Sequence, residues 1–118
     1  MKDEFWTYLD RLIESSKMVI DRSAGSRHPR YPEIVYPLDY GYLAGTSSAD
    51  GDGIDLWRGS IPGQPLQAAL VIVDLHKRDS EIKLLLGCTP EETQTVLDFH
   101  NSGQMRAELL KRPDKDEK

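Results

Sequence analysis

The six residues from Asp50 to Asp55, with the sequence DGDGID, carry three carboxylates and two glycines. In an extended segment Asp50 and Asp52 point the same way, because side chains alternate along a strand. The glycines let the backbone turn tightly, so that Asp55 can come around to the same volume. Hard carboxylate oxygens that converge in this way suit Mg²⁺ or Mn²⁺ rather than zinc.

Two other interpretations of these six residues compete with a catalytic Mg²⁺ site. A solvated Asp/Gly turn between strands is common and explains the same composition. An EF-hand calcium loop fails on spacing, because Asp55 stands where the loop needs glycine and Ile61 stands where it needs glutamate. The catalytic interpretation requires cationic groups elsewhere that would hold phosphate.

Such groups are present, and a solvated surface charge is the simpler explanation for each basic residue taken alone. Together they favour phosphate binding, because lysine and arginine hold phosphate oxygens and tyrosine hydroxyls donate to them. Glu81 shares a strand face with one of them, Lys83. The candidates are Lys17, Arg22, Arg27, Arg30, Tyr36, Tyr40 and Lys83.

The bulk composition limits the class of protein. A chain of 118 residues with 38% hydrophobic and 30% charged residues predicts one globular domain, residues 1–112, followed by a charged tail, residues 113–118. The formal net charge of -5 argues against a broad nucleic-acid surface, which needs a basic face. Cys88 is the single cysteine, so no intrachain disulfide forms, as in a reducing cytoplasm. Residues 1–4 precede no long apolar run, so we expect a cytoplasmic protein without a signal peptide or membrane contact.

Hydrophobic periodicity predicts helix, consecutive strands, then helix, which is an α+β arrangement typical of a small antiparallel barrel with helices outside it. Thr89, Pro90 and Glu92 form the start of a helix, with a capping box and proline at the first helical position. The predicted helices are 4–15, 89–101 and 104–111. The predicted strands are 17–21, part of 33–45 after a bend at Pro37, 54–59, 66–75 and 81–87, the last two as a hairpin.

The stretch from Tyr36 to Asp55, YPLDYGYLAGTSSADGDGID, resembles the centre of the soluble (family I) inorganic pyrophosphatases. These carry a Y-P-x-N/D-Y-G-[FY] segment, a short connector and the signature D-x-D-P-x-D. Upstream, KMVID at 17–21 followed by Gly25 is similar to their K-[YF]-E-[IVL]-D strand and turn. Downstream, EIK at 81–83 is similar to their D-x-K pair. The resemblance covers roughly residues 17–87 and implies a short, divergent member.

The resemblance implies Mg²⁺-dependent hydrolysis of inorganic diphosphate by a metal-activated water, in an OB-like barrel that assembles as a homo-oligomer. Asp52 or Asp55 would lie near the water, and Arg27 or Arg30 would replace the family arginine, whose place falls on His28. The implied metal ligands are Asp50, Asp52, Asp55 and Glu81. The implied diphosphate ligands are Lys17, Tyr36, Tyr40 and Lys83.

The sequence also departs from the family pattern. Gly53 replaces the signature proline, and Val19 replaces an active-site glutamate. Asp74 and Asp79 are the candidates for further acidic ligands. Because the glutamate is missing at Val19, a weakened module that binds a metal–phosphate ligand without turnover is an alternative function. Aromatic residues near Tyr31 leave open hydrolysis of a nucleotide or another organic diphosphate.

Overall fold

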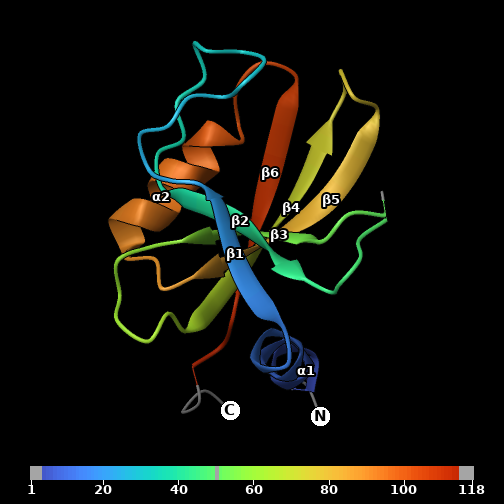
Figure 1. Ribbon diagram of the computed structural model, residues 1–118, viewed down its shortest axis with the longest axis vertical. Coiled ribbons are helices and arrows are strands. Elements are labelled where there is room, and N and C mark those ends of the chain that lie inside the picture. The colour runs from blue at the N-terminus through green and yellow to red at the C-terminus, as the bar shows by residue number, and fades with distance from the viewer. Residues whose placement is uncertain (1–3, 50, 115–118) are drawn as a thin grey trace.

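The computed structural model describes residues 4–49 and 51–114. Within them, two helices pack on one six-stranded sheet (Figure 1). No helix in this part of the chain has the length and apolar character needed to cross a bilayer. The elements are α1 (Glu4–Glu14), β1 (Lys17–Arg22), β2 (Asp39–Ala44), β3 (Ile54–Arg58), β4 (Leu66–Asp74), β5 (Asp79–Leu86), α2 (Pro90–Phe99) and β6 (Met105–Lys111).

The sheet is mixed and open. Its strand order is β1-β2-β3-β5-β4-β6, and the β3–β5 pair is parallel while the other neighbours are antiparallel. The strands β1 and β6 lie at opposite edges and do not pair with each other. The α+β class is therefore confirmed, whereas the predicted closed antiparallel barrel is not.

Alternation along the strands divides the apolar side chains between two faces of the sheet. One face, here called the α2 face, packs Trp57, Leu70 and Leu85 against Val96 of α2. The other face packs Leu43, Leu56 and Leu84 with Trp6 of α1. The α2 face matters for function, because it also carries the charged residues described below.

The local predictions at the helix starts and the hairpin are confirmed. Helix α1, strand β1 and the β4–β5 hairpin lie where the periodicity placed them. The capping box is complete, since Thr89 Oγ1 accepts from the Glu92 amide at 3.1 Å and Glu92 Oε1 accepts from the Thr89 amide at 2.8 Å.

The predicted helix 104–111 is wrong, because this segment is strand β6. It pairs with β4 from Met105 opposite Asp74 to Lys111 opposite Ala68. Met105 packs against the core of the α2 face, while Arg106 and Glu108 are exposed. The segment thus has the period of two typical of a strand, and the long neighbour β4 supplies its hydrogen-bond partners.

Residues 23–38 form a long loop that folds back on itself and joins β1 to β2. Gly25 donates its amide to the Tyr36 carbonyl at 2.8 Å, and His28 donates its amide to Ile34 at 2.9 Å. His28 Nδ1 in turn accepts from the amides of Arg30 and Tyr31 at 3.0 and 3.2 Å. These bonds define the shape of the loop, which lies over one end of the α2 face (Figure 1).

Candidate functional site

Lys83 is the centre of the candidate site. It lies on β5, is only 6% exposed and faces the α2 side of the sheet. Its Nζ donates to the Tyr40 hydroxyl at 2.6 Å and to Asp55 Oδ2 at 3.0 Å. It also donates to Glu81 Oε1 at 3.1 Å. One buried ammonium therefore holds a phenol and two carboxylates together.

Strand register explains this convergence. The parallel β3–β5 pairing places Asp55 directly beside Lys83. Glu81 is two residues before Lys83 on the same strand, so both side chains emerge on one face. Tyr40 arrives from β2, where it pairs with Trp57 of β3. Tyr40, Asp55 and Glu81, which lie on three different strands, thus meet at Lys83.

The protonation states of the two central groups are fixed by their surroundings. Burial alone would lower the pKa of Lys83, but Tyr40, Asp55 and Glu81 together outweigh burial and raise it above its usual value. Burial raises the pKa of Tyr40, and Asp55 adds to this while Lys83 opposes it. The lysine therefore stays an ammonium and the tyrosine stays a neutral hydroxyl at physiological pH.

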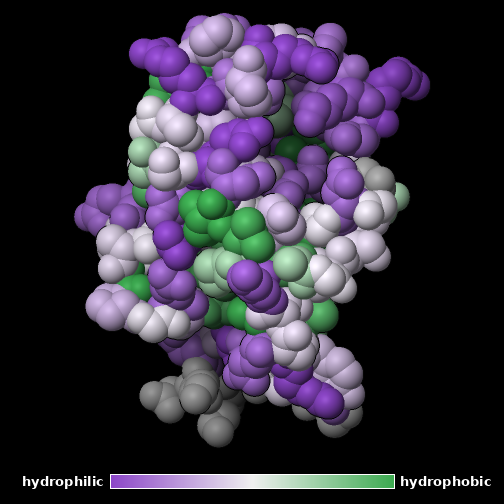
Figure 2. Space-filling model, viewed as in Figure 1, coloured by the Kyte–Doolittle hydropathy of each residue, from purple (hydrophilic) through white to green (hydrophobic). Residues whose placement is uncertain are grey.

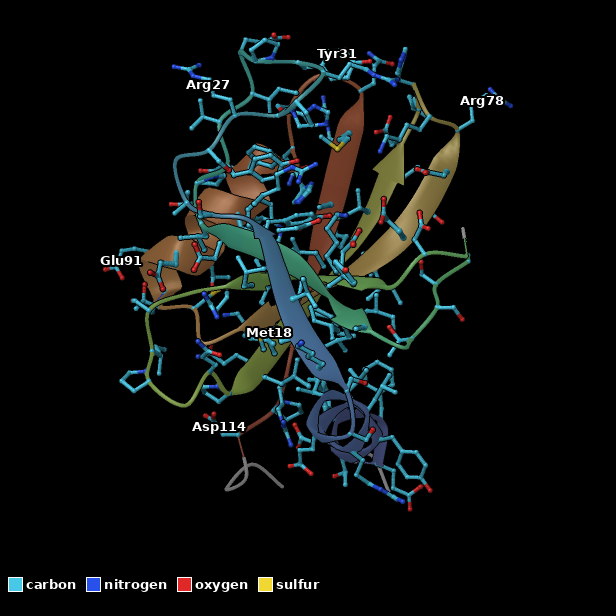
Figure 3. The ribbon with its side chains drawn as sticks, in the orientation of Figure 1. Met18, Arg27, Tyr31, Arg78, Glu91 and Asp114 are labelled. Carbon is cyan, nitrogen blue, oxygen red and sulfur yellow. The ribbon has the colours of Figure 1, made fainter. Side chains whose placement is uncertain are left out.

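A cavity of about 1060 Å³ opens beside this cluster. It lies between the loop 23–38 and the β4–β5 hairpin, and Figure 2 shows the molecule hollowed in its upper half. Tyr31 at the outer turn of the loop lines it, while Arg78 at the hairpin tip points away (Figure 3). Four predicted diphosphate ligands and one predicted metal ligand line this cavity, namely Arg30, Tyr36, Tyr40, Lys83 and Glu81.

Aromatic rings form a continuous layer at the cavity wall, with Tyr36 at its centre. The Tyr36 ring lies 5.4 Å from Tyr40, 6.0 Å from Trp57 and 6.2 Å from Phe99, measured between centroids. The His28 ring lies almost parallel to it, with the two centroids 6.3 Å apart. Tyr36 is only 9% exposed, so packing fixes the position of its ring.

His100 is a residue that sequence reasoning did not place in the site. Trp57 Nε1 donates to His100 Nε2 at 3.1 Å, so the neutral imidazole carries its proton on Nδ1. Burial, with a contribution from the charge of Lys83, lowers the pKa of His100 to about 3. Its buried Nδ1 finds no acceptor among the described residues, which costs about 1–3 kcal/mol. The two partners are 43 positions apart, so no local motif announces them.

Asp39 is a second residue that the motif comparison left without a role. Its carboxylate accepts from Arg58 at 2.8 Å and from the amide of Ala24 at 2.9 Å. The hydrogen bond from Arg58 holds the pKa of Asp39 below its usual value. Asp39 thereby ties the start of the loop 23–38 to strand β3 and helps to position the loop residues over the cavity.

Other predicted ligands lie away from the cluster. Lys17 is exposed at the start of β1, opposite Ala44. Arg27 donates to the Pro32 carbonyl at 2.9 Å and points outward from the loop (Figure 3). Arg22 donates to the carbonyl of its neighbour Asp21 at 3.0 Å. Asp52 is exposed in the β2–β3 connection, and Asp50 lies outside the described residues.

The described residues offer two neighbouring carboxylates, Asp55 and Glu81, and no closed metal cage. Among residues 4–49 and 51–114 no three His, Cys, Asp or Glu side chains converge on a metal position. Asp55 and Glu81 do converge on one cation, the Lys83 ammonium. Mg²⁺ is commonly bound by one or two carboxylates, with waters and substrate phosphates completing its shell. Asp55 and Glu81 supply that number of carboxylates, each with one oxygen already bonded to Lys83.

The arrangement combines a buried cation, two carboxylates, a neutral phenol and a large cavity with aromatic walls. Such a site can bind an anion, polarise it and place a carboxylate next to it. Neither a scan of this chain against protein-family models nor a search of curated proteins finds a match.

Proposed function

We propose that the chain binds a magnesium diphosphate in the cavity beside Lys83 and hydrolyses it to two phosphates. The observation that carries this proposal is the buried Lys83 ammonium, joined to Asp55 and Glu81 within 3.1 Å at the edge of a cavity. A diphosphate needs a fixed cation for its oxygens and carboxylates for the metal that accompanies it. The sequence similarity between residues 36 and 55 and the pyrophosphatase segment supports the same reaction.

Each residue has a role in this proposal. Lys83 and Arg30 hold phosphate oxygens and offset charge on the phosphoryl group that is transferred. Asp55 and Glu81 would hold Mg²⁺, which would supply a bound water of lowered pKa. The water oxygen bonds to one phosphorus, the bridging P–O bond breaks, and the bridging oxygen leaves with the other phosphate. Asp55 takes the proton from the water, and Tyr40 fixes the position of Lys83.

Phosphate release from inorganic diphosphate, measured with and without Mg²⁺, tests the proposal. The wild-type chain should release phosphate only with Mg²⁺. Asp55→Asn should lose at least about 100-fold of the rate, as expected when a general base is removed. Asp98→Asn is the matched control, because the Asp98 side chain is exposed on α2, does not line the cavity, and its carboxylate accepts from Gln94 of the same helix. Wild-type activity in Asp55→Asn would exclude Asp55 from the reaction.

A second candidate function is binding without turnover. The described residues contain no three-ligand metal cluster, which favours this function. Val19 favours it as well, because it stands where the pyrophosphatases carry an active-site glutamate, and it lies opposite Tyr42 on the α2 face. Calorimetric titration with diphosphate and Mg²⁺ separates the two functions. Binding by a folded protein that releases no phosphate would favour the binding module over the hydrolase.

A further inference from the structure

We propose that the cavity is built for a diphosphate that carries a flat ring with hydrogen-bond acceptors, that is, for a nucleoside diphosphate. This inference rests on the proposed function for its phosphate end and adds a second recognition element for the ring. Three features of the cavity lead to it: its size, its lining and one buried donor.

The size of the cavity exceeds what an inorganic diphosphate fills. A volume of about 1060 Å³ lies at the upper end of the range for clefts that bind drug-sized organic molecules. An inorganic diphosphate occupies a small part of such a space and would leave the remainder to water. A nucleoside diphosphate has the length to reach from Lys83 into the rest of the cavity.

The lining is of two kinds, and only one of them suits phosphate. Lys83 and Arg30 supply cationic groups for the diphosphate. Tyr31, Ile34 and Phe99 supply partly exposed apolar surface. Charged phosphate oxygens lose hydration against apolar groups and gain nothing there, whereas a nucleobase gains about 1–3 kcal/mol from stacking on an aromatic side chain. The apolar lining is thus explained by an organic ring.

The buried donor distinguishes a nucleobase from an alkyl chain. His100 lines the cavity and is only 4% exposed, and its Nδ1–H has no acceptor among the described residues. A ring nitrogen or carbonyl oxygen of a nucleobase would satisfy it, while an alkyl group would not. Because Nδ1 itself is not exposed, the base reaches it only when a neighbouring side chain moves.

Trp57 gives a direct signal for this binding, since its indole N–H already bonds to His100. The chain has two tryptophans, so the variant Trp6→Phe leaves Trp57 as the single one. Trp6 belongs to the core on the opposite face of the sheet, so this change does not touch the cavity. We would titrate this full chain with two probes that resist hydrolysis, α,β-methylene-ADP and methylenediphosphonate, with Mg²⁺ present. The nucleotide analogue should bind at least about tenfold more tightly, as expected from one stacking contact and one hydrogen bond.

Two variants test the ring site itself. Phe99→Leu removes a stacking ring and keeps apolar bulk, and His100→Phe removes the donor and keeps a flat ring. Each should reduce the ratio of the two affinities toward one, while Tyr8→Leu on the exposed face of α1 should leave it unchanged. His100→Phe also removes the acceptor for the Trp57 indole N–H. If His100→Phe does not fold, Phe99→Leu alone decides the question.

The outcomes separate this inference from the proposed function. Equal affinities for the two probes, with hydrolysis of inorganic diphosphate intact, would overturn the ring site and leave the hydrolase. Ring-dependent binding without release of phosphate from diphosphate or ADP would keep the ring site and overturn hydrolysis. If isopentenyl diphosphate binds as tightly as ADP, the cavity accepts any apolar group, and the proposal of a nucleobase site is overturned. Failure of both probes to bind would overturn both proposals.

Discussion

Asp55 on β3 and Lys83 on β5 are direct neighbours in the parallel strand pair, with Oδ2 and Nζ 3.0 Å apart. The Lys83 side chain is 8% exposed, and that of Asp55 is 30% exposed. The pair is therefore largely shielded from water on the lysine side and partly hydrated on the aspartate side. This asymmetry determines what removal of either partner does.

We predict that Lys83→Met lowers the free energy of unfolding by about 1–3 kcal/mol, because it leaves Asp55 and Glu81 without their counterion. The value lies below that of a fully buried pair, since water still reaches both carboxylates. Urea unfolding at pH 7 measures it. Lys77→Met is the control, because Lys77 is exposed in the β4–β5 turn and its side chain should contribute less than about 0.5 kcal/mol. Equal stability of the two variants would show that the Lys83 cluster does not stabilise the fold.

The second prediction concerns the pH dependence of stability. The pKa of His100 falls from 6.5 to about 3 on folding, so the unfolded chain takes up a proton in this range and the folded chain does not. The stabilising effect of neutral His100 is thus complete above pH 6.5 and is lost as the pH falls toward 3. The slope contributed by His100 approaches about 1.4 kcal/mol per pH unit.

His100→Phe should remove this slope, whereas His76→Gln should retain it, because His76 is exposed. Urea unfolding between pH 4 and 7 measures the slope for each protein. An unchanged slope in His100→Phe would assign the acid sensitivity to other groups, with the carboxylates first among them.

How much of the site follows from sequence depends on whether a contact is local. Glu81 and Lys83 share a face through simple strand alternation, and Thr89 with Glu92 forms a cap by spacing alone. The contact of Lys83 with Asp55 requires the parallel pairing of β3 with β5, which no short pattern encodes. The resemblance over residues 17–87 supplied that contact only indirectly, by placing Asp55 and Lys83 in one expected site.

Strand β6 illustrates why local propensity misleads. Its sequence MRAELLK consists of residues that all rank high as helix formers. Strand β4, with Ala68, Leu70 and Ile72 buried, offers a free edge, and pairing with it partly buries the alternate residues Met105, Ala107 and Leu109 of β6. Tertiary hydrogen bonding therefore outweighs helix propensity here. The same limit applies to the bond between Trp57 and His100, which joins two segments distant in sequence.

Gly41 gives a third prediction, on close packing of β1 and β2. A Cβ at this position would overlap the carbonyl of Val19 on the neighbouring strand. Gly41→Ala should therefore lower the free energy of unfolding by at least about 2 kcal/mol, because backbone atoms must move. At Gly25, with φ at +86°, a Cβ meets nothing within 4 Å, so Gly25→Ala should cost only about 1 kcal/mol. Thermal unfolding followed by circular dichroism compares the two, and equal losses would contradict the steric argument.

The fourth prediction concerns the start of α2, where Glu92 performs two tasks. Its Oε1 accepts from the Thr89 amide at 2.8 Å and from the Ser60 amide at 3.1 Å. Thr89→Ala removes one capping bond and should cost about 1 kcal/mol. Glu92→Ala removes the reciprocal bond and also releases the turn after β3 from the helix, so it should cost more than Thr89→Ala.

A double-mutant cycle with Ser60→Pro separates the two tasks of Glu92, because proline removes the amide that donates to it. If the turn contact contributes, Glu92→Ala should cost less in the Ser60→Pro background than in the wild type. Additive losses would assign the whole effect of Glu92 to the cap. Since α2 carries Val96 and Phe99 onto the core and cavity wall, coupling at its first turn would link the β3–β5 region to the aromatic layer.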